Sequence, residues 1–305
     1  MSRKLFLLLV VIFLSNCSFS QGHEFYNEKI DSVWTKVADG FDFPEGPARS
    51  SSGDIYVSNC YGKWITKLTP ESAEVFLSAS EKPFTFAQTN GLAFNDEGFL
   101  FACDYSLGAI IKIDLNGNSE IYSSGYEGVK FNRPNDLAFD KKGNLFFTDP
   151  KNYHKDSLTG RVFMVEKNSG QTKLVYDGLA FPNGITFSNS GEDLFVCESA
   201  KQRILKFKVE AGGKLSDSKV FVELPGGDPD GIDFDSEGNL YAAHFGGGAV
   251  YKISPTGEVL QKISTPGKKP SNVEFGGDDL KTLFITECET NSVYSMRVDI
   301  PGAKK

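Results

Sequence analysis

Six polar side chains, each placed immediately before a short apolar segment, recur along the chain at steps of 45, 45, 48, 47 and 42 residues. They are Glu45, Asn90, Asn135, Asn183, Asp230 and Asn272. All six offer oxygen atoms, and none is positively charged. Oxygen ligands with two negative charges suit a hard divalent cation, Ca²⁺ first and Mg²⁺ or Mn²⁺ next. Asn and Asp also favour strand entry by bonding their own backbone, which would explain any one of these positions except Glu45.

The segment 131–150, FNRPNDLAFDKKGNLFFTDP, is the clearest copy of the repeat. A turn enters a short apolar strand, a second turn at 141–144 supplies Gly and Asn, and a second strand runs back. In such a hairpin, the start of the first strand and the end of the second lie at the same edge of the sheet. Asn135 and Asp149 are therefore expected at one rim.

A repeat in the forties with four short strands per unit is typical of a β-propeller blade. The sixth copy ends early, after the strand at 293–298, whereas residues 33–40 look like a fourth strand that lacks the preceding three. We therefore predict an all-β, six-bladed β-propeller with four-stranded blades, the last one closed by an N-terminal strand, which buries two open edges. The predicted single domain covers 34–300, between a lead-in at 21–33 and a tail at 301–305.

The composition excludes some partners. The 305 residues carry a net charge of −8 and have a pI near 5.1. An acidic surface repels nucleic acid and anionic membranes, so neither is expected as a partner. The sequence leaves the oligomeric state open.

The N-terminus predicts export. A basic start at 1–4 precedes ten apolar residues at 5–14, which are too few to span a bilayer. Ser18 and Ser20 suit cleavage ahead of Gln21, so residues 1–20 are predicted to be a signal peptide and the mature protein to be periplasmic or secreted, with no membrane span. A competing interpretation is a lipoprotein anchored at Cys17.

Two cysteines, Cys60 and Cys288, follow equivalent strand ends in the first and last repeats, which ring closure makes neighbours. Equivalent strands of adjacent repeats usually lie too far apart at the rim for a disulfide. We expect two unpaired thiols rather than a bridge.

Several motifs occur in order, each at the start of a blade. They are Glu45-Gly46-Pro47, Arg133-Pro134-Asn135-Asp136 with Phe147-Thr148-Asp149-Pro150, Phe181-Pro182-Asn183-Gly184, Pro229-Asp230-Gly231 and Gly246-Gly247-Gly248. With these motifs the chain resembles the gluconolactonase, regucalcin (SMP-30) and LRE family of six-bladed propellers, from about Trp34 to Val298.

The resemblance implies roles for individual residues. Glu45, Asn183 and Asp230 match metal ligands, Asn135 matches a ligand of metal or substrate, and Arg133 matches a substrate contact. The position of Asp230 is proposed in that family as the catalytic acid or base. Where regucalcin-like members have an acidic residue that helps bind sugar, this chain has Tyr153, which places sugar-lactone specificity in doubt.

A second set of polar residues closes the second strands at the same rim: Asn59, Asp104, Asp149, Glu198, His244 and Glu287. These side chains could bond neighbouring backbone or orient the ligand amides. A carboxylate near a cation could also act as general base, and Asp149 is our candidate beside Asp230; His244 titrates near neutral pH and is ranked below both. Asn90, His244 and Tyr153 join Arg133 and Asn135 as predicted substrate contacts.

The predicted reaction is metal-assisted opening of a lactone. One divalent cation, with Ca²⁺ first and Mg²⁺, Mn²⁺ or Zn²⁺ as alternatives, would polarise the carbonyl while a carboxylate activates water. The chain lacks the GxSxG motif that positions a serine nucleophile. The alternatives are the same metal site acting on another ester or phosphotriester, and a non-catalytic propeller that only binds a ligand.

Overall fold

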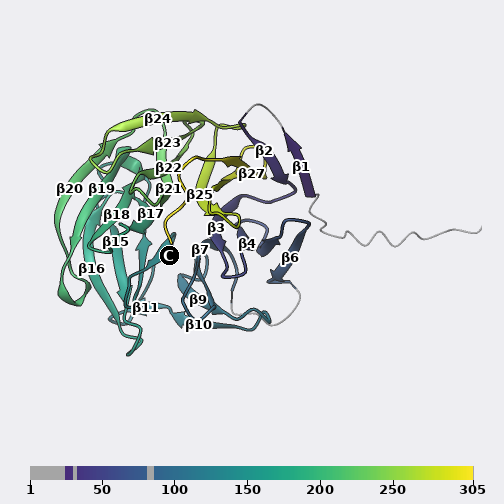
Figure 1. Ribbon diagram of the computed structural model, residues 1–305. Helices are drawn as coiled ribbons and strands as arrows, with labels where there is room; N and C mark the ends of the chain where they lie inside the picture. The colour runs from purple at the N-terminus through teal and green to yellow at the C-terminus, as the bar shows by residue number, and fades with distance from the viewer. Residues whose placement is uncertain (1–24, 30–32, 81–85, 305) are drawn as a thin grey trace, which may run out of the picture.

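The computed structural model describes residues 25–29, 33–80 and 86–304. The predicted signal peptide and the alternative anchor at Cys17 lie outside these residues. Figure 1 shows sheets arranged as a ring, and the predicted six-bladed propeller of four-stranded antiparallel sheets is confirmed. No helix in the described part of the chain is long and apolar enough to cross a membrane.

The first five blades follow the order of the chain, and each runs from an inner strand to an outer strand. Blade 1 contains β3 (Pro44–Arg49), β4 (Ile55–Asn59), β5 (Trp64–Leu68) and β6 (Ala73–Ser78), and blade 2 contains β7 (Thr89–Phe94), β8 (Leu100–Asp104), β9 (Ala109–Ile113) and β10 (Ser119–Ser123). Blade 3 contains β13 (Leu137–Phe139), β14 (Leu145–Asp149), β15 (Gly160–Val165) and β16 (Thr172–Leu179). Blade 4 contains β17 (Pro182–Phe187), β18 (Asp193–Glu198), β19 (Arg203–Val209) and β20 (Leu215–Glu223), and blade 5 contains β21 (Asp228–Phe234), β22 (Leu240–Phe245), β23 (Ala249–Ile253) and β24 (Val259–Ser264).

Blade 6 joins the two ends of the chain. Its strands β25 (Pro270–Gly276), β26 (Thr282–Glu287) and β27 (Ser292–Arg297) are followed by β2 (Thr35–Ala38), which pairs antiparallel with β27. The strand β1 (Phe25–Lys29) pairs with β2 as a fifth strand, in a segment for which the sequence indicated no element. Figure 1 shows these purple N-terminal strands beside the yellow C-terminal ones.

Further elements decorate the connections. A hairpin of β11 (Gly125–Tyr126) and β12 (Val129–Lys130) joins blades 2 and 3, and two short 3-10 helices, η1 (Ser199–Lys201) and η2 (Ala211–Gly213), lie in blade 4. These pieces are too short for their hydrophobic period to be visible in the sequence.

The core consists of apolar layers between blades, because both faces of each sheet are covered. Phe146 and Phe147 are adjacent on β14 and therefore point to opposite faces. Phe146 packs edge-on against Phe187 of blade 4, with ring centroids 5.1 Å apart, whereas Phe147 packs against Phe131 and Phe163. This explains why the second strands read as continuous apolar runs rather than alternating ones.

The four cysteines of the described residues are buried and unpaired, so Cys60 and Cys288 form no disulfide, as expected. The Cys288 thiol instead donates a hydrogen bond of 3.4 Å to the Pro44 carbonyl across the junction of blades 6 and 1. Burial raises the pKa of both thiols.

The C-terminal tail is bound to the propeller. The Pro301 carbonyl accepts a hydrogen bond from Ser236 N, Gly302 N donates to the Leu280 carbonyl, and Ala303 N donates to the Phe234 carbonyl. These partners lie at or beyond the ends of the inner strands β21 and β25. The predicted site residues lie at the opposite ends of the same strands. Figure 1 marks the C-terminus near the centre of the ring.

Candidate functional site

Bulges at the start of the inner strands direct the site residues. In blade 1, Pro44 pairs with Asn59 and Glu45 with Ser58, but the next pair is Ala48 with Tyr56. The same shift occurs in blade 5 beside Asp230 and in blades 2, 4 and 6. An extra residue in one strand bends it and re-aims its side chains. The polar residue is therefore turned out of the sheet at the axial end of each of these blades.

Glycines allow neighbouring inner strands to approach closely. A Cβ on Gly46 would collide with the backbone oxygen of Asn90, and a Cβ on Gly184 would collide with that of Asp230. Each glycine thus packs against the site residue of the next blade, which draws the ring of side chains together.

Two buried carboxylates dominate the electrostatics of this ring. Glu45 is 4% exposed and Asp230 is 6% exposed. Burial, followed by the charge of Asp136, raises the pKa of Glu45 to about 8. Burial, followed by the charge of Glu45, holds the pKa of Asp230 well above its usual range, and a hydrogen bond with the Asn183 side chain partly offsets this. Glu45 also accepts a hydrogen bond from Asn272 Nδ2.

The donor set fits a hard cation. Asn135 Oδ1 is buried and has no hydrogen-bond partner among the residues that the structure describes. Among the side chains described in 33–80 and 86–304, no three or more His, Cys, Asp or Glu form a metal-binding group. The candidate ligands are instead two carboxylates together with amides. Such mixed oxygen ligands are typical of Ca²⁺, whose charge would offset the desolvation and mutual repulsion of Glu45 and Asp230.

The structure adds Asp136, which the sequence reasoning missed. It raises the pKa of both Glu45 and Asp230, so its charge lies close to theirs. Its Oδ2 accepts a hydrogen bond of 3.1 Å from Ile185 N in blade 4. A glycine follows the site residue in four of the six repeats, and Asp136 occupies that position in the third. This break in the pattern was the available signal.

The second polar set binds backbone. Asp149 is 1% exposed, and its Oδ1 accepts a hydrogen bond of 2.7 Å from Arg133 N while its Oδ2 accepts bonds from Asn132 N and Nδ2. Four other members of this set accept equivalent hydrogen bonds from the segment that enters the same blade. The donors are Asp42 N for Asn59, Ala87 N and Gln88 N for Asp104, Ala180 N for Glu198, and Lys269 N for Glu287. The catalytic role of Asp149 stays a prediction, and these contacts favour a positioning role.

His244 also bonds to the backbone, but its ring donates the hydrogen bond, whereas the other side chains of this set accept theirs. The ring is 1% exposed, and its Nε2–H donates a hydrogen bond of 2.8 Å to the Leu224 carbonyl. Burial lowers the pKa of the imidazole. Substrate binding by His244 is untested, and so buried a ring is better suited to supporting the rim.

The remaining predicted substrate contacts differ in access. Arg133 is exposed, Asn90 is buried, and Tyr153 is 56% exposed. The Tyr153 hydroxyl donates a hydrogen bond of 2.6 Å to Asp228 Oδ2 at the start of β21. The loop between β14 and β15 therefore reaches from blade 3 past blade 4 to blade 5.

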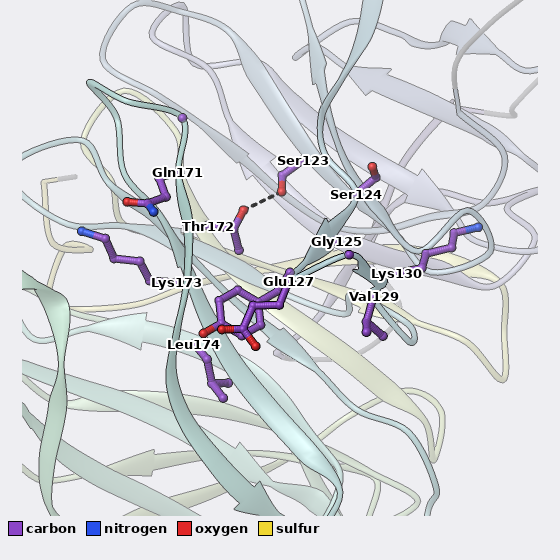
Figure 2. Close-up of a pocket in the computed structure, with 13 residues that line it drawn as sticks. Ser123, Ser124, Gly125, Glu127, Val129, Lys130, Gln171, Thr172, Lys173 and Leu174 are labelled. Atoms are coloured by element: carbon purple, nitrogen blue, oxygen red, sulfur yellow. Dashed lines mark hydrogen bonds between the residues drawn. The ribbon is translucent and has the colours of Figure 1, made fainter.

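A groove of about 1100 Å³ lies elsewhere, between the outer parts of blades 2 and 3. Figure 2 shows its lining from 123–130 and 170–174, with the hydrogen bond between the Ser123 and Thr172 hydroxyls at 2.8 Å. It contains none of the predicted site residues, and its wall has no buried carboxylates. The axial ring therefore remains the candidate site.

Comparison with known proteins places the chain in a family. The profile of the SMP-30/Gluconolactonase/LRE-like region matches residues 43–289. The chain is 28% identical to the diisopropyl-fluorophosphatase of Loligo vulgaris, over 90% of this chain and 95% of the relative, and 30% identical to a gluconolactonase of Zymomonas mobilis, over 82% and 77%. A solved gluconolactonase structure from Xanthomonas campestris superposes with a TM-score of 0.77 at 26% identity, over 88% of this chain and 89% of that one.

Proposed function

Because the chain belongs to the SMP-30/gluconolactonase/LRE-like family, we propose that it is a divalent-metal-dependent hydrolase that opens a lactone. The observation that carries this proposal is the pair of buried carboxylates, Glu45 and Asp230, each held by the side-chain amide of an asparagine. A scaffold gains nothing from burying two acids together, since each raises the other's proton affinity. The names of the relatives support the coarser class of lactone and ester hydrolases.

Four residues would hold the cation: Glu45, Asn135, Asn183 and Asp230. A bound divalent cation, with Ca²⁺ as the first expectation and Mg²⁺, Mn²⁺ or Zn²⁺ as alternatives, would supply a Lewis acid for the lactone carbonyl oxygen. Asn272 fixes one carboxylate oxygen of Glu45 by hydrogen bonding. Asn183 does the same for Asp230.

The other residues bind substrate and move a proton. Arg133 presents an exposed guanidinium beside the ring, and the Asp149 carboxylate fixes its backbone. Asn90 lies on the neighbouring inner strand and can donate to a substrate oxygen. Asp230, which the resemblance marks as the acid or base, would accept a proton from the attacking water.

A second candidate reaction uses the same site on a phosphorus centre. The similarity to a diisopropyl-fluorophosphatase over nearly the whole chain favours this alternative. A Lewis acid acts on P=O as it does on C=O, so the site geometry alone supports both reactions.

The test combines metal analysis with turnover on purified mature protein. We expect about one tightly held divalent ion per chain and hydrolysis of at least one lactone from a panel that includes D-glucono-δ-lactone. Diisopropyl fluorophosphate in the same panel tests the second reaction. Bound metal without turnover of any lactone would refute the lactonase reaction, and absence of a bound ion would favour a ligand-binding propeller.

We also propose that the protein is exported by its N-terminal segment. Cell fractionation tests this, because the mature protein should appear in the periplasm or medium, and labelling by a fatty acid would instead indicate the anchor at Cys17.

A further inference from the structure

Two contacts near the axis join blades that are not neighbours. The first involves Phe43, which precedes β3 in blade 1. Its ring centroid lies 4.5 Å from that of Tyr61 and 6.2 Å from that of Phe245 at the end of β22 in blade 5. Blade 6 separates blades 1 and 5, and blades diverge away from the axis. Side chains of these two blades can therefore meet only over the axial end of blade 6.

The second contact is made by Tyr153. Its ring packs edge-on against Phe181 of blade 4, with centroids 5.1 Å apart, and its hydroxyl bonds to Asp228 of blade 5. The same geometric argument applies, because blade 4 separates blades 3 and 5. These side chains therefore lie over the axial end of blade 4.

Both contacts lie on the side of the predicted site. Phe43 and Phe181 each stand two residues before a site residue, Glu45 and Asn183 respectively. Both have left-handed backbone conformations, with φ of 59° and 57°. Such angles are uncommon for bulky residues and persist where the surroundings hold them, often at ligand-binding positions.

We call Phe43, Tyr61 and Phe245 the seam cluster and Tyr153 and Phe181 the loop cluster. Blade 5 contributes to both contacts through Phe245 and Asp228, which pair with each other, so both clusters adjoin the start of the strand that carries Asp230. Tyr61 and Tyr153 are more than half exposed, which leaves aromatic surface for a ligand.

The walls are poorly suited to a polyhydroxylated sugar. Recognition of several hydroxyls needs several directional polar partners, and Asp228 beside the loop cluster already accepts a hydrogen bond from the Tyr153 hydroxyl. Lys269 places its ammonium 6.0 Å from the Phe245 ring centroid, so this cation also faces aromatic surface. The aromatic faces instead favour burial of apolar groups.

Resting on the proposed lactonase function, we propose that the substrate is a lactone or ester with an apolar or aromatic substituent, which packs between the seam cluster and the loop cluster. The exposed Arg133 lies in blade 3, where a polar end of the substrate would be accepted. The substituent determines specificity, and the carbonyl is placed at the Glu45–Asp230 ring.

The test uses δ-lactones that share one reacting ring. These are δ-valerolactone, δ-decalactone, dihydrocoumarin and D-glucono-δ-lactone. We expect kcat/KM for δ-decalactone and dihydrocoumarin to exceed that for δ-valerolactone by roughly ten-fold or more, since hydrophobic pockets discriminate by factors of this order. D-Glucono-δ-lactone should be the poorest substrate.

Variants at exposed positions identify the walls. Tyr61→Ser and Tyr153→Ser should lower the ratio of δ-decalactone to δ-valerolactone turnover by about ten-fold. Tyr153→Phe keeps the ring but removes its bond to Asp228, which separates aromatic contact from attachment of the loop. Leu115→Ser is the matched control, because Leu115 is 54% exposed in an outer turn of blade 2 and should change neither rate.

A binding measurement makes the test independent of turnover. The δ-lactam counterpart of δ-decalactone resists hydrolysis, and calorimetry should show it binding wild type at least about ten-fold more tightly than Tyr61→Ser. Turnover of D-glucono-δ-lactone equal to or above that of δ-decalactone overturns this inference and leaves the lactonase function standing. Lactam binding without hydrolysis of any lactone supports the clusters and refutes the reaction.

Discussion

The side-chain amide of Asn272 donates a hydrogen bond to the carboxylate of Glu45, and this contact joins residues 227 positions apart. Asn272 belongs to blade 6 and Glu45 to blade 1, so the bond crosses the junction at which the ring closes. The amide holds one oxygen of a carboxylate that burial has deprived of water. The candidate metal site is therefore complete only in the closed ring.

Replacing a carboxylate of the ring should abolish metal binding. Glu45→Gln and Asp230→Asn keep the size of each side chain but remove the charge that a hard cation requires. We expect loss of the bound ion and a fall in kcat of about 10²-fold or more, measured by metal analysis and lactone turnover.

The matched control is Asp54→Asn on the same blade as Glu45. Asp54 pairs with Lys67 at 3.2 Å, away from the ring, and its loss should leave both metal and rate unchanged. Retention of metal by both ring variants would contradict the assigned ligands.

Metal affinity should increase with pH. In the folded protein without a cation, the raised pKa of about 8 keeps Glu45 protonated well above the ordinary value of 4.5. A cation must displace that proton, so the apparent affinity should fall by up to about ten-fold per pH unit as the pH is lowered from 8 toward 5.

The same protonation has a consequence for stability. Between pH 4.5 and 8 the unfolded chain releases a proton that the folded metal-free protein retains, so this carboxyl makes the metal-free protein less stable as the pH rises. Thermal unfolding of the metal-free wild type and of Glu45→Gln would show it. Equal slopes against pH in the two proteins would refute the assignment.

Asp149→Asn distinguishes positioning from base catalysis. Because Asp149 accepts bonds from Asn132 and Arg133, loss of its charge should cost about 1–3 kcal/mol of stability and raise KM. The pH profile of kcat should keep its shape. Disappearance of the acidic limb of that profile would instead identify Asp149 as the general base.

His244→Gln should reduce the loss of stability that occurs as the pH is lowered from 7 to 5. Burial lowers the pKa of His244, so below about pH 6.5 the unfolded chain binds a proton that the folded ring does not. Wild type should lose more melting temperature between pH 7 and 5 than His244→Gln. His154→Gln is the control, since that side chain is 66% exposed, and it should follow wild type.

The propeller could be predicted because its information is repeated six times. Each copy combined a polar entry residue, a turn and an apolar second strand, so an error in one copy was corrected by the others. The strand β1 and the short hairpin of β11 and β12 each occur once, outside the repeat, so no repeated pattern indicated them.

The candidate site was predictable where it follows the repeat and not where it departs from it. Glu45 and Asp230 stand in register with the other entry residues, whereas Asp136 lies one position beyond that register. The sequence also placed Asp149 at the correct rim, but only the coordinates show that its oxygens face the backbone of Asn132 and Arg133. The direction in which a side chain points at the rim depends on tertiary packing, which the repeat pattern does not specify.

The pairing of β2 with β27 also sets the order of events during synthesis. Thr35 emerges from the ribosome long before its partner Ser295, so the edge of β2 that pairs with β27 must wait until almost the whole chain has been translated. Contacts between residues so far apart in sequence form slowly. During that interval an exposed strand edge is open to other nascent chains, and a chaperone that shields it would raise the yield of folded protein.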